Sequence, residues 1–560
     1  MTPNGLKWMT RCAAAMLAAL STTSAGVSAQ QISEARIKEL IKQAAEQLGQ
    51  PSATLQPIPQ TSPSATPPVV RLTLDDAVKF ALDRNLDIAV QRLNPELQDI
   101  AYASLKSVYL PALTSTLSQN GTTSASTSQI SGGSAAAGVS TDVFTYNGGL
   151  TQSVPRGGGS FAVTANNFRQ TTTNNNSFYN PQYQSTWSGA YVQPLLRNFR
   201  IDSTRQQLAI TKLTRDISDV QLRATITNTL SNVRNAYWDY VFAVQAVEVA
   251  QQSLSLADKL VQDNRTRVEV GTMAPIDIVS AQSEAASRKQ ALVQAQATKR
   301  TTEIALKRLI VSGTADPNWN ASIDPVDRPD FRPEPVDIPA AVRRALSERT
   351  DIAIAQKTEQ ENDVTLRYLQ DQMKPQADLQ ATYGVQGVGG TQLVRSQVLG
   401  GDATTIPGGI SDAFRTLFAQ NYPRWTVALN LQYPIGLSAQ KASVARARVQ
   451  VNQIQAQLKQ VELQVATDVT NAAIGVQNNA EAVQASQVAT TLAKQKLDAE
   501  QSKFEVGMST NYNVVLAQRD LSDAQNTELR NILNYRKSLV ELERLQQTTL
   551  GSLGITVIGR

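Results

Sequence analysis

One stretch of the chain, residues 203–270, contains neither proline nor glycine. Its apolar residues recur mostly in steps of three and four, the spacing of a coiled-coil seam: Leu230, Val233, Tyr237, Val241, Val244, Val247, Leu254, Ala257 and Val261. At 1.5 Å per residue, a helix over this stretch would be roughly 100 Å long, far longer than the helices of ordinary globular domains. Such a helix needs an apolar partner along its length, so a compact globular fold is disfavoured.

Three further segments extend this helical pattern. A return helix is predicted over 276–309, after a turn at Gly271. The same arrangement is predicted again over 439–506 and 512–550, with Gly507 at the turn. We expect each pair of helices to form an antiparallel hairpin, because glycine readily adopts the backbone φ that the reversal requires.

The two hairpins belong to a duplicated unit. Residues near the start of each copy correspond at a constant offset, Leu74, Ala77, Val78, Ala81, Leu82 and Asp87 in the first matching Ile338, Ala341, Val342, Ala345, Leu346 and Asp351 in the second. The offset still holds at Pro111 and Pro375, where a helix is expected to give way to a strand. A second match pairs residues 267–271 with 503–507. Each unit is therefore predicted to run short helix, strand region, long helix, glycine turn, long helix.

The N-terminus has the order of a secretory signal peptide. Lys7 and Arg11 flank a short apolar run, and small residues lead to a predicted cleavage after Ala29. The apolar run is too short to span a bilayer, so it predicts export rather than anchoring. An amphipathic helix and a proline-rich linker are predicted before the first unit. The chain is thus divided into a signal peptide (1–29), this helix and linker (30–71), the first unit (72–310), a connecting linker (311–336), the second unit (337–551) and a tail (552–560).

The strand region of the second unit has two unlike faces. Over 424–433, apolar residues alternate with mostly polar ones, and Trp425 and Tyr433 stand at the ends of the apolar face. Residues 379–386 alternate in the same way and are predicted to pair with them. An apolar face with aromatic ends and a wettable opposite face is what a transmembrane β-strand requires. A half-buried strand of a soluble sandwich shows the same alternation.

The strand region of the first unit is less regular. Trp187 and Tyr191 lie on one face of a predicted strand. The preceding residues 119–185 are rich in Ser, Thr, Asn and Gly, and they predict a long exposed loop that could hold an extra hairpin near 155–159. Two strands per unit give four per chain, too few to close a barrel, because an open edge leaves backbone groups unpaired in lipid. Three chains would supply twelve strands.

Composition excludes several kinds of chemistry. Histidine is absent, and the only cysteine, Cys12, lies in the predicted signal peptide, so the mature chain would lack the commonest general base and any thiol. The formal net charge is +5 without a block of consecutive Lys or Arg, which disfavours nucleic acid as a partner. The glycine run at 157–159 lacks the Lys-Ser or Lys-Thr of a phosphate loop. We predict no enzyme activity, no cofactor and no metal site.

Three motifs together resemble the TolC family of outer-membrane channel proteins. They are residues 72–77 (LTLDDA), residues 193–197 (QPLLR), and a Val-Gly turn followed by Asp277, Ile278, Val279, Ala281 and Gln282. Each motif alone is weak, whereas their duplicated order over nearly all of 72–551 is specific. The resemblance implies an α+β membrane protein that forms, as a homotrimer, a twelve-stranded transmembrane β-barrel in outer-membrane lipid, continued by an α-helical coiled-coil tunnel through the periplasm. It implies a passive exit duct for a tripartite efflux pump or a type I secretion system.

The resemblance also implies roles for the helical tips. A periplasmic adaptor protein, belonging to an inner-membrane transporter, would dock at Val270, Gly271, Met273, Val506, Gly507 and Ser509. The gate acid of relatives corresponds to Asp277, and their gate tyrosine and arginine correspond to Phe504 and Ser509. Their acidic rings correspond to Asn513 and Leu516. We therefore expect a constriction held by packing and neutral hydrogen bonds, with weaker cation preference than an acidic ring gives.

Two other classes of protein share part of this pattern. A secreted coiled-coil adhesin or structural fibre would have the export signal and the heptads, but it would not need an alternating strand at 424–433. A periplasmic adaptor protein also combines a helical hairpin with strands, but it normally has one hairpin rather than two. Dependence on detergent for solubility would distinguish a membrane channel from the adaptor.

Overall fold

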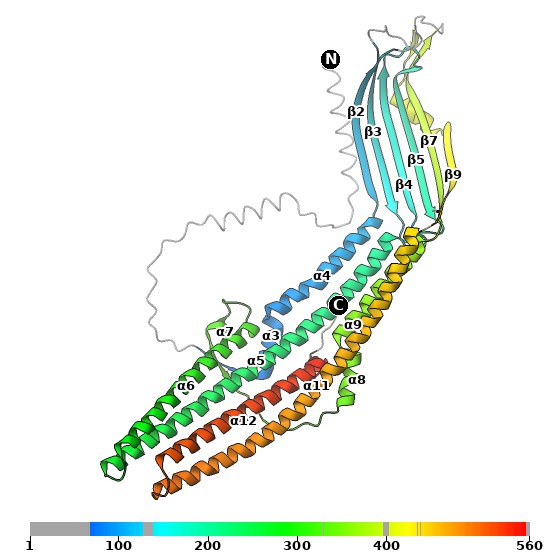
Figure 1. Cartoon of the computed structure of the whole chain (residues 1–560). Coiled ribbons are helices and arrows are strands. Elements are labelled where there is room, and N and C mark those ends of the chain that lie inside the picture. The colour runs from blue at the N-terminus through cyan, green and yellow to red at the C-terminus, as the bar shows by residue number, and fades with distance from the viewer. Residues whose placement is uncertain are drawn as a thin grey trace, which may run out of the picture. The chain divides into compact units, whose positions relative to one another are not determined.

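The computed structural model describes residues 68–126, 138–328, 330–395, 403–433, 435–436 and 438–555. The predicted signal peptide, the N-terminal amphipathic helix and most of its linker lie outside the described residues. Long helices make up one end of the described chain and an antiparallel β-sheet makes up the other (Figure 1).

Two helical hairpins form most of the helical part. They are α5 (Ser203–Glu269) with α6 (Pro275–Ile310), and α11 (Ser438–Glu505) with α12 (Asn511–Leu545). These bounds match the predicted helices to within a residue or two, except at the end of α12. There the chain leaves the helix because Gln547 takes a φ of 57°, and the short helix α13 (Thr549–Ser552) follows.

The start of each unit folds as the same pair of helices. In the first unit the pair is α3 (Leu74–Arg84) and α4 (Leu86–Lys106), followed by a 3-10 turn, η1 (Ser107–Tyr109), and in the second it is α8 (Ile338–Glu348) and α9 (Thr350–Gln372). The Thr73 hydroxyl caps α3 by accepting from the amide of Asp76, and the Asp337 carboxylate caps α8 by accepting from the amide of Ala340. The constant sequence offset therefore marks a structural repeat. Strand β1 (Val69–Leu72) precedes the first unit, whereas α7 (Pro317–Asn320) and β6 (Ser322–Pro325) lie in the linker between the two units. Strands β1 and β6 pair in parallel.

The sheet contains six long strands and one short strand. They are β2 (Ala112–Ser124), β3 (Val139–Ser153), β4 (Ser160–Thr172), β5 (Tyr179–Pro194), β7 (Gln376–Arg395), β8 (Ala403–Ile406) and β9 (Tyr422–Gln432). All neighbours are antiparallel, in the order β2-β3-β4-β5-β7, with β9 along the first half of β7 and β8 along its far end.

The predicted strand count is wrong for the first unit. Residues 119–185 do not form one long loop, because they contain β3, β4 and parts of β2 and β5. The extra hairpin near 155–159 exists, as the turn between β3 and β4. The described residues thus place six long strands in one sheet where four were expected, so the figure of twelve strands for three chains no longer follows from the strand count. The composition of residues 119–185 led to the wrong prediction of a loop. The water-facing positions of a barrel carry the same Ser, Thr and Asn residues as an exposed loop.

The sheet has an apolar face that runs across all six long strands. Side chains alternate along each strand, so the pairing registers decide which residues share a face. One face, called here the apolar face, carries Leu113, Leu117, Phe144, Tyr146, Leu150, Phe161, Val163, Trp187, Tyr191, Leu379, Tyr383, Val385, Trp425, Val427, Leu429 and Leu431. The opposite, polar face carries mainly Thr, Ser, Asn and Gln, including the row Thr116, Asn147, Asn166, Thr186 and Gln386. The predicted alternation therefore holds beyond the strands in which it was recognised.

One short helix lies on the apolar face. Helix α10 (Ile410–Phe418) packs closely on β7 because Gly387 has no side chain, and a Cβ there would overlap the carbonyl oxygen of Ala413. The ring of Phe418 meets Trp187 edge to face, with the ring centroids 5.6 Å apart. The apolar face is thus partly covered by α10, and elsewhere its side chains are half-buried in β3 and exposed in β2 and β9.

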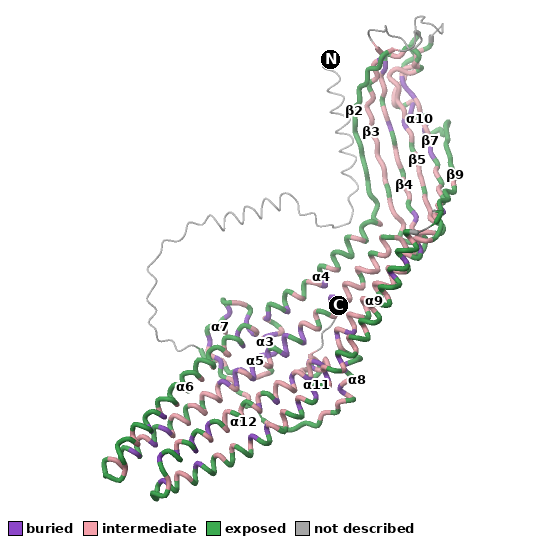
Figure 2. Tube along the Cα trace, viewed as in Figure 1, coloured by how far each residue is buried: buried purple, intermediate pink, exposed green. Residues whose placement is uncertain are grey.

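The helices next to the sheet lie side by side in the same order as the strands to which they connect. Next to the sheet the helices contact one another in the order α4-α5-α9-α11, and further away in the order α6-α5-α12-α11. The described chain is therefore a wall with β2, α4 and α6 along one edge and β9 and α11 along the other (Figure 1). Strands β2 and β9 are exposed along nearly their whole length (Figure 2).

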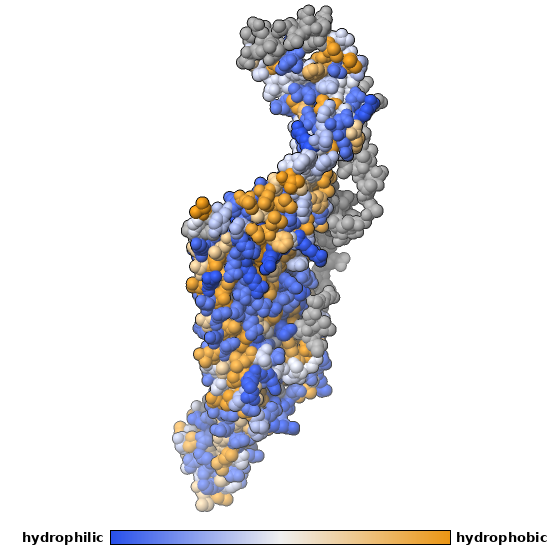
Figure 3. Space-filling view, turned by 90° about the vertical axis from the view of Figure 1, so that its right-hand side faces the viewer, coloured by the Kyte–Doolittle hydropathy of each residue, from blue (hydrophilic) through white to orange (hydrophobic). Residues whose placement is uncertain are grey.

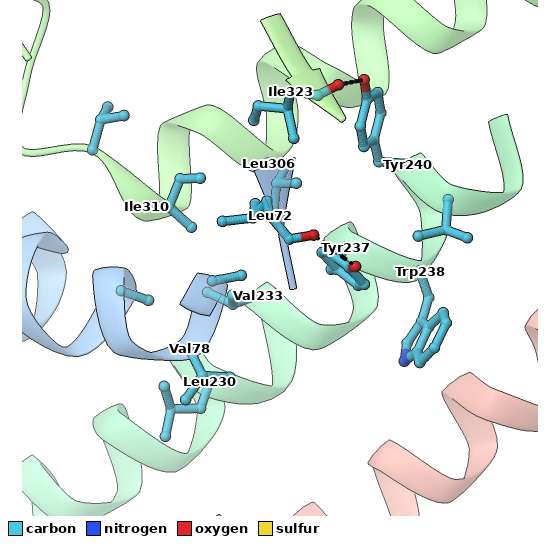
Figure 4. Packing of buried hydrophobic residues seen from close by; sticks show 14 of the residues in the cluster. Leu72, Val78, Leu230, Val233, Tyr237, Trp238, Tyr240, Leu306, Ile310 and Ile323 are labelled. Atoms are coloured by element: carbon cyan, nitrogen blue, oxygen red, sulfur yellow. Dashed lines mark hydrogen bonds between the residues drawn. The ribbon is translucent and has the colours of Figure 1, made fainter. Parts of the chain in front are cut away.

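The largest buried cluster joins β1, α3, α5, α6 and β6 (Figure 4). Leu230 and Leu306 are completely buried in it. Tyr240 donates its hydroxyl hydrogen to the carbonyl oxygen of Ile323, and the Tyr237 hydroxyl oxygen lies 2.7 Å from the Asp327 carboxylate. Burial raises the pKa of both tyrosine hydroxyls above the ordinary value, so they remain protonated donors.

In the described part of the chain, no helix combines the length and the apolar character needed to cross a membrane.

Candidate tunnel tip and gate

Both hairpins turn at a glycine in the left-handed conformation. Gly271 has a φ of 83° and Gly507 a φ of 79°. In each turn, the glycine N–H donates to the carbonyl three residues earlier and the next N–H donates to the carbonyl five residues earlier, which is the Schellman arrangement. A Cβ at either glycine would meet nothing within 4 Å, so the backbone conformation, and not lack of space, favours glycine.

The two turns present apolar side chains to solvent at the end of the helices away from the sheet (Figure 1). Val270, Val506 and Met508 are exposed by 72%, 70% and 78%. Met508 was not among the predicted docking residues, whereas Met273, which was, packs against a buried cluster between the hairpins. The Ser509 hydroxyl is also engaged within the chain, because it donates to the carboxylate of Glu500 at 2.6 Å. The exposed docking candidates are therefore the turn residues themselves.

Asparagine side chains connect the two hairpins near the tip. The fully buried Asn264 of α5 donates from its amide to Oδ1 of Asn511 in α12, at 2.9 Å. The Asn511 amide nitrogen in turn lies 3.4 Å from the carbonyl oxygen of Asp277 in α6. The carboxylate of Asp277 has no hydrogen-bond partner among the described residues. The predicted gate acid therefore joins the contact through its backbone within one chain.

Phe504 lies between the hairpins and not at an open surface. It is 6% exposed, and the Arg267 guanidinium stands over its ring, 4.4 Å from the centroid. Nη1 of Arg267 also donates to the Phe504 carbonyl oxygen at 3.2 Å. A phenylalanine at this position can pack and accept a cation over its ring, but it cannot donate a side-chain hydrogen bond.

A charged cluster further along the hairpins was not predicted from the sequence. Glu284 of α6 is 4% exposed and accepts from Nε of Arg288 at 2.7 Å and from the guanidinium of Arg519 in α12. Arg519 therefore connects the two hairpins through a carboxylate that is buried in α6. The spacing of Glu284 and Arg288 is a visible sequence signal for a helical ion pair, whereas only the fold brings Arg519 to them.

A hollow of about 200 Å³ lies beside this cluster, between α6 and α12. Asp277, Leu516 and Glu284 are among the residues that line it. The residues predicted to form the gate are Asp277, Phe504, Asn513 and Leu516, and the fold brings Asp277 and Leu516 together. The other two lie elsewhere, because Phe504 is buried between the hairpins and the Asn513 side chain is exposed near Ser509, 3.4 Å from its hydroxyl.

The charged cluster predicts how the tip responds to pH. Burial alone would raise the pKa of the Glu284 carboxyl, but the hydrogen bond from Arg519 and the charge of Arg288 outweigh burial and hold the pKa below its ordinary value. A carboxyl with a lowered pKa stabilises the folded contact fully above its unfolded-state pKa, and this contribution is lost as the pH falls through the lowered value. We expect the two hairpins to stay together from neutral to mildly acidic pH and to separate only in stronger acid.

Spin labels at Val270→Cys and Val506→Cys would measure this separation as the pH is lowered. Glu284→Gln, which cannot ionise, should remove the acid transition. A transition near neutral pH, or one that persists in Glu284→Gln, would show that another group controls the contact.

The predicted membrane aromatics lie along the sheet. Trp187, Tyr191 and Trp425 are on the apolar face, and Tyr433 directly follows β9. Trp425 and Tyr433 are exposed by 74% and 56%.

No group of three or more metal-ligating side chains occurs within the described ranges of the chain.

A two-faced antiparallel sheet with long strands, joined end to end with two long helical hairpins, defines a membrane channel with a helical extension. The chain matches the outer membrane efflux protein family over residues 160–311 and 341–546, and it belongs to that family. It is therefore an outer-membrane transport protein of the TolC-like type and not an enzyme. This membership decides against the coiled-coil adhesin and the periplasmic adaptor.

Solved outer-membrane channels share the fold. CmeC of Campylobacter jejuni is 14% identical, with 84% of this chain and 85% of that chain covered at a TM-score of 0.58. VceC of Vibrio cholerae is 14% identical, with 84% and 95% covered at a TM-score of 0.58. MtrE of Neisseria gonorrhoeae, solved in an open state, is 17% identical, with 84% and 88% covered at a TM-score of 0.57. No curated protein sequence matches the chain.

Proposed function

We propose that three copies of this chain close into a tube that serves as a passive exit duct through the outer membrane. The main observation is that, within the described residues, the two-faced sheet ends in two unpaired edges, β2 and β9, both exposed. In lipid, each unpaired backbone N–H or C=O costs several kcal/mol. Pairing β2 of one copy with β9 of the next would satisfy both edges, as long as the ring closes.

The helices support the same joining of opposite edges. Helix α4 exposes an apolar stripe in steps of four and three: Leu86, Val90, Leu93, Leu97 and Ile100. Helix α11, at the other edge, exposes Val449, Leu463, Val488 and Leu492. Figure 3 faces the side with β9 and α11, where apolar patches lie among polar residues. A contact between unlike edges is head-to-tail and forms a ring when its rotation closes. The number three follows from the resemblance to the TolC family.

The duct would work with partners that supply the energy. In this proposal a periplasmic adaptor docks at the two tips and connects the tube to an inner-membrane transporter of a tripartite efflux pump or a type I secretion system. The exposed turn residues Val270, Val506 and Met508 give such an adaptor an apolar contact. An apolar contact surface of this kind is typical of the centre of a protein interface.

Val270→Asp and Met508→Asp are expected to weaken adaptor docking at least tenfold each. The reason is that a carboxylate placed in the apolar contact must lose its water without gaining a partner. The measurement is binding of the purified tube to a purified periplasmic adaptor protein from the same cell, by surface plasmon resonance. Thr527→Asp, an exposed position of α12 away from both tips and both edges, serves as the control and should bind normally. Equal loss in the control, or none in the tip variants, would place docking elsewhere.

The tube itself is tested by purification from membranes in detergent, with mass determination and negative-stain electron microscopy. A particle with three chains, a short barrel and a long hollow stalk is the expected result. A monomer, or a soluble protein that needs no detergent, would overturn the proposal.

A further inference from the structure

The glycine run at 157–159 forms the turn between β3 and β4. Gly157 and Gly158 have φ values of 78° and 65°, which glycine adopts without strain. The amide of Val154 donates to the carbonyl oxygen of Gly159 at 2.7 Å and closes the turn. The turn lies at the end of the sheet where the helices begin (Figure 1).

This turn is anchored to the junction between strand and helix. The side-chain amide of Gln193, at the end of β5, donates to the carbonyl oxygen of Gly157 at 2.8 Å. A Cβ on Gly158 would come 2.5 Å from the carbonyl oxygen of Asn198, in the segment that leads into α5. Next to the turn, the Gln152 amide donates to the carbonyl oxygen of Tyr109 at 3.0 Å, just before β2. The β3–β4 hairpin is thus held against the elements that flank it on both sides.

The β3–β4 hairpin also has the length and the apolar face of membrane-spanning strands. Strands β3 and β4 are 15 and 13 residues long, and a tilted strand needs roughly 9–11 residues to cross a bilayer. Leu150 and Val163 share the apolar face with Leu113 of β2 and Tyr383 of β7. If the hairpin protruded into water, burial of an apolar face would not favour aligning its apolar residues with those of the neighbouring strands.

We propose that all six long strands of each chain are part of the barrel, so that the trimer has a wall of eighteen strands. This inference rests on the proposed trimer. Strand β2 leads away from the helices and β9 returns to them, so β2 of one copy and β9 of the next are antiparallel, as the other strands are. At equal tilt, the circumference grows with strand number and is about one and a half times that of twelve strands. The outer exit is then wide and polar, and the restriction lies at the helical tip.

Disulfide cross-linking distinguishes a barrel of eighteen strands from a barrel of twelve. In a Cys12→Ser background, Thr164→Cys with Ser188→Cys should form an intrachain bond, because these directly paired residues of β4 and β5 have hydroxyl oxygens 2.8 Å apart. Thr116→Cys in β2, combined in turn with Thr426→Cys, Ala428→Cys or Asn430→Cys in β9, should give a covalent trimer on a denaturing gel in at least one combination. Every position named lies on the polar face.

A twelve-stranded wall would instead pair β2 directly with β5. Thr116→Cys combined with Thr186→Cys, Ser188→Cys or Ala190→Cys should therefore stay reduced, because two strands separate β2 from β5 in the eighteen-stranded wall. A covalent trimer together with a β2–β5 bond would overturn the eighteen-stranded wall and leave the proposed function standing. Failure of every β2–β9 combination would overturn the ring itself, and the wall with it. A strand count from cryo-electron microscopy of the same trimer should give eighteen.

Discussion

Glu284→Arg is expected to open the tunnel tip. The substitution removes the buried acceptor of Arg519 and Arg288 and places a third guanidinium beside them. Loss of a partner costs about 3–5 kcal/mol in a fully buried ion pair. Here Arg288 is 15% exposed and Arg519 is 55% exposed, so solvent lowers the cost below that range, while the new like charge adds to it. The two hairpins should therefore separate. Single-channel recordings at neutral pH should show a several-fold higher conductance, and cells should admit large hydrophilic antibiotics that the outer membrane normally excludes.

Two matched variants separate a specific effect from general damage. The exchange Glu284→Arg with Arg519→Glu restores one pair and should recover part of the closed state. Glu481→Arg changes the same charge at an exposed position of α11 and should behave as the unmodified protein. If Glu284→Arg assembles in the membrane and still conducts like the unmodified channel, the charged cluster does not hold the gate.

Val427→Arg should largely prevent assembly in the outer membrane. Val427 lies on the apolar face of β9, 64% exposed, in the middle of the strand. An arginine facing lipid near the bilayer midplane costs about 2–4 kcal/mol in a β-barrel. In the proposed trimer each substitution occurs three times, so the total cost is comparable to the stability of a whole domain.

Ala428→Arg is the matched control, since the next residue along the strand lies on the polar face. It should assemble normally and shift ion selectivity towards anions. The measurement is the fraction of protein that can be extracted from membranes as the folded oligomer, followed by the free energy of unfolding in lipid. Normal assembly of Val427→Arg with loss of Ala428→Arg would mean that the two faces of the sheet are assigned the wrong way round.

The sequence predicted the helical part closely because the physical signal there is local. A coiled-coil seam repeats every three or four residues, so α5 and α11 could be bounded to within one residue from the apolar pattern and the glycine turns alone. The duplication fixed the order of elements in the second unit. The alternation around Trp425 was enough to predict β9, because apolar and polar residues alternate more regularly in this strand than in the others.

The contacts near the helical tip were predicted less completely, because they join residues far apart in the chain. Family positions led to Asp277 and Leu516, which do line the same hollow. They did not lead to Glu284 and Arg519, whose pairing depends on how α6 and α12 pack against each other. They also gave no indication that Phe504 is buried beneath Arg267.

The sequence by itself determined that this chain has two copies of a helical hairpin joined to membrane-facing strands, because helical and strand periods are properties of consecutive residues. Only the tertiary structure decided how many strands the wall contains and which charges join the hairpins. In β3 and β4 the apolar residues are too sparse along either strand to mark a membrane span, and they become a continuous face only when cross-strand registers place Leu150 beside Val163 and Leu113. Pairing between strands and contacts between helices are long-range, so no local pattern specifies them.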